Sequence, residues 1–159
     1  MEMIDEISPR DRQREKEQQQ KKEPIGYTGI ILDDQSIKRI EQSISDLIPD
    51  GWTIEEKPHL TINMGEATPE NMRLLGIPTN LYATHIGMSD KAIAILVDGF
   101  SEQFKPQSNI PHITIGYDGA GGGRPKDSKD ITDWKPLRRK LRLRGYLEEV
   151  PMFKREGFN

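Results

Sequence analysis

Hydrophobic and polar positions between Tyr27 and Val150 fall into short segments separated by turn residues. Segments with β-branched and aliphatic residues, or with strict alternation, are typical of strands. In Leu141–Val150, for example, Leu141 and Leu143 alternate with Arg142 and Arg144. Besides two strands described below, the pattern predicts strands at Tyr27–Leu32, Leu81–Met88, Ala92–Val97 and Leu141–Val150.

The sequence predicts helices in two segments of the chain. Apolar residues recur at intervals of three and four between Ile37 and Ile48, after the capping residues Asp33 and Asp34, and Pro49-Asp50-Gly51 ends the segment. Thr68-Pro69-Glu70 begins a shorter helix that runs to about Leu75. Strands outnumber helices in this order of elements, which predicts an α+β fold with strands packed on few helices.

One pentapeptide occurs twice. Pro58-His59-Leu60-Thr61-Ile62 returns 53 residues later as Pro111-His112-Ile113-Thr114-Ile115, and the chain holds only three histidines. Each copy has a strand's alternation after a proline, which predicts a further strand at each site. Because residues i and i+2 of a strand share a face, each copy presents one imidazole and one hydroxyl together.

Composition limits the organisation of the chain. A length of 159 residues is typical of one domain, and 33% hydrophobic against 31% charged residues indicates that part of the chain stays out of the core. Residues 1–24 are rich in Gln, Glu, Lys and Arg, and we interpret them as a charged, flexible arm. Residues 25–159 are then the folded domain. The chain has no cysteine, no apolar run of membrane-spanning length and no signal-peptide core, which favours a cytoplasmic protein without a membrane contact.

Charge is unevenly spread. The net charge is −7 over residues 25–123 and +5 over residues 124–159, and the basic residues are densest between Lys135 and Arg144. A local basic patch on a mildly acidic protein suits an anionic ligand, although a solvated strand face would have the same composition.

Two histidines at one site can share general acid and general base work near neutral pH. Threonine hydroxyls beside them can donate hydrogen bonds to phosphate oxygens without the repulsion that a carboxylate would bring. The two imidazoles lack the further ligands of a zinc site, and no Ser or Cys stands in a nucleophile motif. These residues therefore predict phosphoester cleavage without a metal or another cofactor.

The paired His-x-Thr motifs resemble those of the 2H phosphoesterase superfamily. The resemblance implies a bilobal α+β fold, in which antiparallel sheets related by a pseudo-twofold axis each supply one motif to a central cleft. It also implies that His59 and His112 are the acid and base, and that Thr61 and Thr114 hold the scissile phosphate. Which histidine is the base is not evident from the sequence.

Within this superfamily the chain is most similar, in size and general character, to the phage anti-CBASS nucleases. That resemblance implies hydrolysis of cyclic di- and trinucleotide signals in the cytoplasm of a host cell. Two alternatives stay open: a phosphodiesterase for RNA with 2′,3′-cyclic or 2′,5′ linkages, and a non-catalytic module that binds nucleotides or RNA. The expected partner is a cyclic oligonucleotide or short RNA; no obligate protein partner is evident, and the oligomeric state is not predicted.

Five further residues are candidates for substrate binding. Aromatic side chains near the predicted strands could stack on a nucleobase, and arginines on one face of the last strand could meet phosphates. These candidates are Tyr27, Tyr117, Trp52, Arg142 and Arg144. The glycine-rich segment Asp118–Asp130 lacks the ending of a phosphate-binding P-loop, and we interpret it as a flexible loop that could cover the site.

Overall fold

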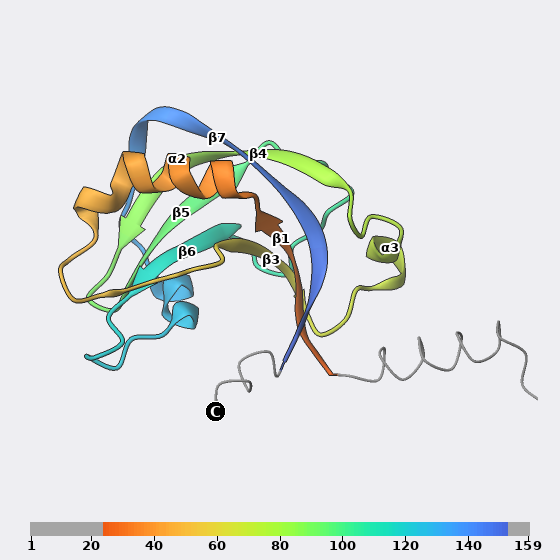
Figure 1. Cartoon of the computed structure of the whole chain (residues 1–159), viewed down its shortest axis with the longest axis horizontal. Coiled ribbons are helices and arrows are strands. Elements are labelled where there is room, and N and C mark those ends of the chain that lie inside the picture. The colour runs from red at the N-terminus through yellow and green to blue at the C-terminus, as the bar shows by residue number, and fades with distance from the viewer. Residues whose placement is uncertain (1–23, 153–159) are drawn as a thin grey trace, which may run out of the picture.

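The strands pair edge to edge around a closed barrel, as the computed structural model of residues 24–152 shows (Figure 1). Six strands run antiparallel in the order β6-β3-β1-β7-β4-β5, and β5 pairs with β6 to close the ring. A short strand, β2, extends the ladder of β6 beyond β3. The strands are β1 (Ile25–Leu32), β2 (Thr53–Ile54), β3 (His59–Met64), β4 (Pro78–Met88), β5 (Ala92–Asp98), β6 (His112–Tyr117) and β7 (Trp134–Pro151).

The predicted bilobal α+β fold is therefore wrong. In two lobes the motif strands would belong to separate sheets with a cleft between them, whereas here β3 and β6 are neighbours in one sheet. On the far side of the ring, β4 pairs with β7 from Pro78↔Tyr146 to Gly87↔Trp134, so the wall is continuous there too. The helices are few and short, and the motif residues lie on the wall of a barrel.

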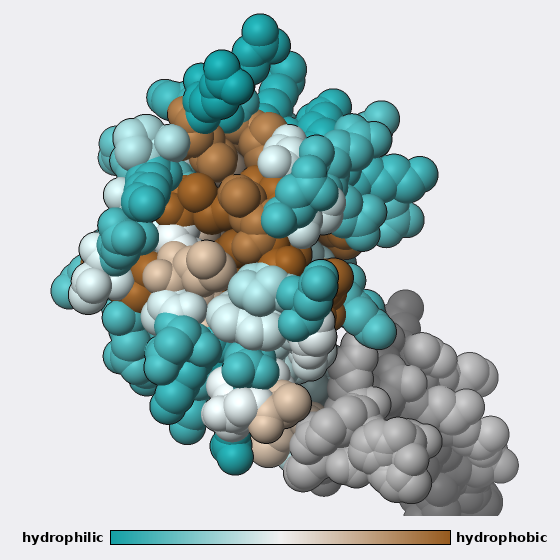
Figure 2. All heavy atoms as spheres, turned by 90° about the vertical axis from the view of Figure 1, so that its left-hand side faces the viewer, coloured by the Kyte–Doolittle hydropathy of each residue, from teal (hydrophilic) through white to brown (hydrophobic). Residues whose placement is uncertain are grey.

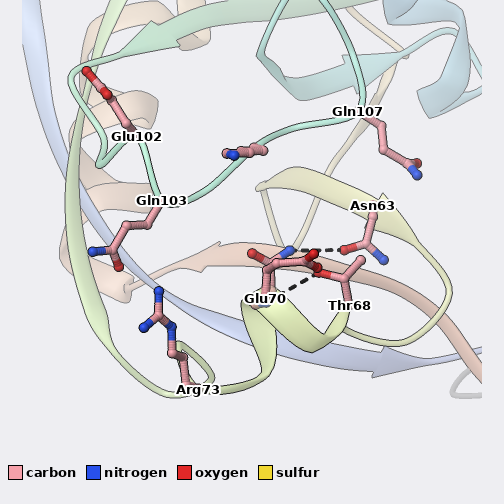
Figure 3. Close-up of a pocket in the computed structure, with 9 residues that line it drawn as sticks. Asn63, Thr68, Glu70, Arg73, Glu102, Gln103 and Gln107 are labelled. Carbon is pink, nitrogen blue, oxygen red and sulfur yellow. Dashed lines mark hydrogen bonds between the residues drawn. The ribbon is translucent and has the colours of Figure 1, made fainter.

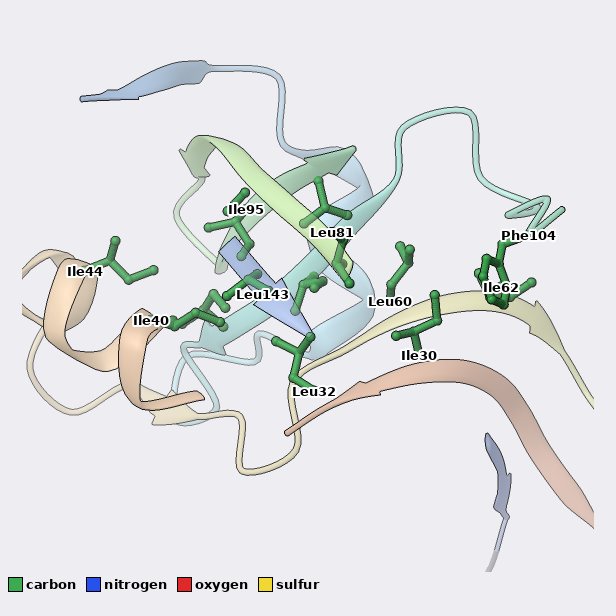
Figure 4. Close-up of a cluster of buried hydrophobic side chains, with 14 of the residues drawn as sticks. Ile30, Leu32, Ile40, Ile44, Leu60, Ile62, Leu81, Ile95, Phe104 and Leu143 are labelled. Atoms are coloured by element: carbon green, nitrogen blue, oxygen red, sulfur yellow. The ribbon is translucent and has the colours of Figure 1, made fainter. Parts of the chain in front are cut away.

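The hydrophobic core fills the barrel and continues under the first helix (Figure 4). Helix α2 (Asp34–Ile44) contributes Ile40 and Ile44 to the same cluster as the strand residues Leu32, Ile95 and Leu143. At another part of the cluster, Phe104 from the connection after β5 packs near Ile62 of β3. The fully or nearly fully buried members from the strands include Ile30, Leu60, Leu81, Ile113 and Leu147.

The first helix starts as predicted and ends earlier. The Asp33 carboxylate accepts a hydrogen bond from the Ser36 backbone N–H at 2.8 Å, so Asp33 is the N-cap. After Ile44 the chain tightens into the 3₁₀-helix η2 (Ser45–Leu47) and does not continue as an α-helix to Ile48. Serine and aspartate compete for backbone hydrogen bonds and shorten a helix in this way. The second helix, α3 (Pro69–Met72), is likewise shorter than predicted.

The glycine-rich segment has a defined conformation. The Asp118 carbonyl accepts hydrogen bonds from the backbone N–H groups of Gly121 and Gly123, and the 3₁₀-helix η3 (Pro125–Asp130) follows. Gly123 is buried, and a Cβ on it would lie 2.5 Å from the Lys91 carbonyl oxygen, so this close approach requires glycine. The prediction of a loop missed this turn and the helix after it.

An apolar patch interrupts the polar surface near the C-terminal end of α2 (Figure 2). Beside it, a cavity of about 840 Å³ lies between α2 and the first part of β7, and its lining includes Leu47, Ile86, Leu137 and Arg138. Strand β7 begins at Trp134, seven residues before the predicted start, because Lys135 and Pro136 already pair with β4. The basic run predicted as a patch thus belongs to this strand.

The predicted arm of residues 1–24 lies, apart from Pro24, outside the described residues. Among residues 24–152, no helix combines the length and the apolar character needed to cross a membrane.

The buried hydroxyl of Ser36 links α2 to the barrel. It donates to the Arg144 carbonyl at 3.3 Å and accepts from the Arg144 N–H at 2.8 Å. We expect Ser36→Ala to lower the free energy of unfolding by about 1–3 kcal/mol, because a backbone N–H at this junction loses its partner. Urea unfolding measures the change. Ser43→Ala, at an exposed position of the same helix, is the matched control, and equal effects of the two substitutions would contradict the proposed link.

Candidate active site

The two motif strands meet at the residue between histidine and threonine. Leu60 of β3 pairs with Ile113 of β6, and these side chains are 1% and 0% exposed. Because they point into the core, the histidine and threonine of each motif point out of the barrel. This antiparallel register sets His59 across from Thr114 and Thr61 across from His112, so the two imidazoles occupy diagonal corners of a four-residue group.

The surroundings of the motif backbones also match. His59 pairs with Ile31 of β1, and His112 pairs with Leu96 of β5. In both ladders the register shifts just after the threonine. The carbonyl of the leading proline accepts a hydrogen bond at 3.2 Å in each copy, from Leu32 and Val97 respectively. The repeated pentapeptide therefore produces a repeated local structure.

Each histidine is oriented by a backbone carbonyl two residues earlier. Nδ1 of His59 lies 2.9 Å from the Lys57 oxygen, and Nδ1 of His112 lies 2.8 Å from the Ile110 oxygen. A carbonyl only accepts hydrogen bonds, so in the neutral imidazole Nδ1 carries the proton and Nε2 keeps its lone pair. Both rings can then accept or return a proton through Nε2.

Tyr27 covers one face of the His59 ring. The ring centroids are 4.4 Å apart with an interplanar angle of 20°, and the phenol oxygen lies 3.3 Å from Nδ1. Beside this contact, Gly29 lets β1 approach β3 closely, because a Cβ there would lie 2.8 Å from the Leu60 carbonyl oxygen. Burial, with the nearby Glu55 and Glu148 carboxylates, raises the pKa of Tyr27 to about 12, so the phenol stays neutral.

Burial also determines the charge of His59. It lowers the pKa of His59 below the reference value of 6.5; the bond to the Lys57 carbonyl opposes this shift, and repulsion from His112 adds to it. The influence of His112 is consistent with the proximity of the two rings. Near Tyr27, burial raises the pKa of the Glu55 carboxyl. His59 is therefore held mainly as the neutral base near pH 7.

The two motif threonines differ in their contacts. The Thr114 hydroxyl donates to the Pro125 carbonyl at 3.2 Å and lies 2.8 Å from the Ser128 hydroxyl. Within residues 24–152, the Thr61 hydroxyl has no hydrogen-bond partner. Helix η3 thus packs on one motif and leaves the other open.

A cavity adjoins each histidine. The one beside His59 has a volume of about 710 Å³, and Tyr27, Glu55 and Glu148 help to line it. The one beside His112 is smaller, about 200 Å³, and Ser128 and Lys129 help to line it. Pro125 belongs to the larger cavity, so η3 borders both.

The remaining candidates lie away from the histidines. Trp52 packs against the hydrophobic core, and Tyr117 pairs with Thr53 and Ala92 at the end of β6. Arg142 and Arg144 are exposed on β7, which is separated from β3 by β1, and the Arg144 guanidinium lies 6.0 Å from the Tyr146 ring. Of the five predicted substrate contacts, Tyr27 stacks on a motif histidine, and the roles of all five remain predictions.

Another cavity lies apart from the motifs. Its volume is about 500 Å³, and it lies between α3 and the segment 102–107 (Figure 3). Its lining is polar and includes Asn63, Arg73 and Glu102 but neither histidine nor threonine of the motifs. No group of three or more His, Cys, Asp or Glu side chains suited to holding a metal ion occurs in the part of the chain that the structure describes.

No protein-family model and no curated protein matches the chain. Among solved structures, the chain is similar to one titled "Crystal Structure of Fungal RNA Kinase", with 15% sequence identity and a TM-score of 0.49. The match covers 80% of this chain and 42% of the neighbour, so this chain spans less than half of that protein.

The lowered pKa of His59 predicts a dependence of stability on pH. The unfolded state takes up a proton near pH 6.5, before the folded state does. The contribution of His59 to the free energy of unfolding should therefore be constant above that pH and fall as the pH is lowered toward the folded-state pKa. Imidazole NMR should show His59 titrating below 6.5, and His59→Gln should flatten the pH dependence in urea unfolding. Titration of His59 at or above 6.5 would contradict the inferred burial effect.

Proposed function

We propose that this protein is a metal-independent phosphodiesterase of the 2H type that cleaves cyclic di- and trinucleotides. The observation that carries the proposal is the diagonal placement of two carbonyl-oriented imidazoles around two threonines on one face of the barrel. In-line displacement at phosphorus has its nucleophile and leaving group on opposite sides. An acid and a base at opposite corners suit that geometry.

The surroundings of the two histidines support a division of the acid and base roles. Burial and the neighbouring His112 lower the pKa of His59 and favour its neutral form, which supports the role of base for His59. Its Nε2 takes the proton of a ribose 2′-hydroxyl (the 3′-hydroxyl in a 2′,5′ linkage), whose oxygen bonds to the adjacent phosphorus and forms a 2′,3′-cyclic phosphate. His112, protonated at Nε2, gives its proton to the departing 5′-oxygen as the phosphorus–oxygen bond breaks. Thr61, whose hydroxyl has no protein partner among residues 24–152, donates to a non-bridging phosphate oxygen.

The cavities favour a phosphate with a group on each side. A space beside each histidine can receive the two nucleosides that flank an internal linkage, as in a cyclic oligonucleotide or a 2′,5′-linked RNA. A terminal 2′,3′-cyclic phosphate would use one of the two spaces only. Cyclic di- and trinucleotides are therefore the first substrates to test, with 2′,5′-linked RNA as the second class.

We expect His59→Ala and His112→Ala each to lower turnover by a factor of about 10²–10⁴, because each removes a proton-transfer group. The measurement is product formation in excess EDTA from cyclic di- and trinucleotides, a 2′,5′-linked dinucleotide and a 2′,3′-cyclic-phosphate RNA. His85→Ala, which removes the third histidine on β4, is the matched control and should keep full activity. Activity that disappears in EDTA and returns with Zn²⁺ or Mn²⁺ would instead indicate a metallohydrolase, and tight binding without turnover a binding module.

The assignment of acid and base has its own test. A substrate with sulfur in place of the bridging 5′-oxygen has a leaving group that needs no proton. We expect it to restore most of the turnover lost in His112→Ala and little of that lost in His59→Ala, since only the second variant lacks the base. Rescue of His59→Ala alone would reverse the two roles.

A further inference from the structure

We propose that the two motif threonines have different tasks: Thr61 contacts the substrate phosphate, whereas Thr114 holds η3 through Ser128 and so places Lys129 to bind that phosphate. This inference rests on the proposed phosphodiesterase function. It assigns Lys129 as a phosphate-binding residue and Ser128 as a positioning residue.

The single proton of the Thr114 hydroxyl is used within the protein. A threonine hydroxyl has one proton to donate, and that of Thr114 is directed to the Pro125 carbonyl. The Ser128 hydroxyl lies 2.8 Å from Thr114 Oγ1; either hydroxyl can donate across this distance, and Ser128 is the donor when the Thr114 proton is on the Pro125 carbonyl. In this arrangement Thr114 has no proton left for a phosphate oxygen. Thr61 is not restricted in this way.

Burial of the Ser128 hydroxyl fixes the position of η3. Ser128 is 0% exposed, and Thr114 is its only side-chain hydrogen-bond partner among the described residues. A buried hydroxyl without a partner costs about 1–3 kcal/mol, so the pair holds η3 against β6. Ile131, 3% exposed, anchors the chain directly after the helix. The segment thus has a fixed position beside His112.

Lys129 brings a positive charge to the cavity beside His112. Lys129 follows Ser128 directly, is exposed, and lines the same cavity as His112. It is the one lysine or arginine of that lining, and it has no ion pair within residues 24–152. An ammonium group at this position can neutralise a phosphate beside the imidazole. Lys126 belongs to the same helix and is also exposed, but it is not part of either lining.

The first test compares the two lysines. We expect Lys129→Ala to raise KM for the nucleotide substrate about tenfold, with kcat changed by less than about twofold, because a charge-assisted phosphate contact is lost from binding. Lys126→Ala, the matched control, should leave both constants unchanged. The dissociation constant for inorganic phosphate, followed by NMR of the His112 imidazole, should rise by a similar factor in Lys129→Ala only. Equal behaviour of the two variants in phosphate binding would overturn the assignment of Lys129.

The second test is a double-mutant cycle. If Thr114 acts through Ser128, Thr114→Val should weaken phosphate binding and lower kcat/KM in the wild-type protein. In a Ser128→Ala background, the same substitution should change either constant by less than about twofold. Thr114→Ser, which keeps the hydroxyl, should restore both constants. Thr61→Val should add its full effect to Ser128→Ala. Full additivity of Thr114→Val with Ser128→Ala would overturn the positioning role and make Thr114 a direct phosphate ligand.

The two readouts separate this inference from the proposed function. If the wild-type protein binds phosphate but turns over no substrate, the phosphodiesterase proposal is refuted. The phosphate dissociation constants of the variants still decide the roles of Lys129 and Thr114. Normal turnover with no difference between the lysine variants in either readout refutes the inference alone. Thermal unfolding of each variant is the control that tests whether the fold is kept.

Discussion

The candidate site depends on the burial of Leu60 and Ile113 where the two motif strands meet. Because side chains alternate along a strand, burying the residue between histidine and threonine is what turns both of them to the outside. A slip of one residue in either strand would bury an imidazole and expose an aliphatic side chain, which the core does not tolerate. The same contact that stabilises the barrel therefore sets the register of the four polar residues.

Closure of the barrel fixes the relative position of the two motif strands. Each motif strand is hydrogen bonded on both edges, β3 by β1 and β6, and β6 by β5 and β3. The separation of the two imidazoles is then determined by neighbouring strands of one sheet and does not depend on how two lobes approach each other. Groups held on paired strands lose little freedom when a substrate binds, which favours catalysis by positioning.

Local pattern was sufficient for part of this picture. Alternation or β-branched content located β1, β3, β4, β5 and β6, and alternation placed His59 with Thr61 and His112 with Thr114 on shared faces. The cap at Asp33 was likewise visible in the sequence. Strand partners were not, because pairing such as that of β4 with β7 joins residues far apart in the chain, and the bilobal expectation failed at that point. The contact of Tyr27 with His59 and that of Thr114 with Ser128 also depend on long-range folding, and no local signal marks Ser128 as the support of Thr114.

The repeat in the sequence is more symmetric than the site that it builds. Both copies orient their imidazoles through a carbonyl two residues earlier, yet Tyr27 and burial act on His59, whereas η3 acts on Thr114. In the proposed reaction, displacement at phosphorus has a direction, since one oxygen must lose a proton while another gains one. Two identical motifs in identical surroundings would have no preference between these tasks. The difference must come from residues outside the motifs, and in this barrel it comes from an aromatic ring on one side and a short 3₁₀-helix on the other.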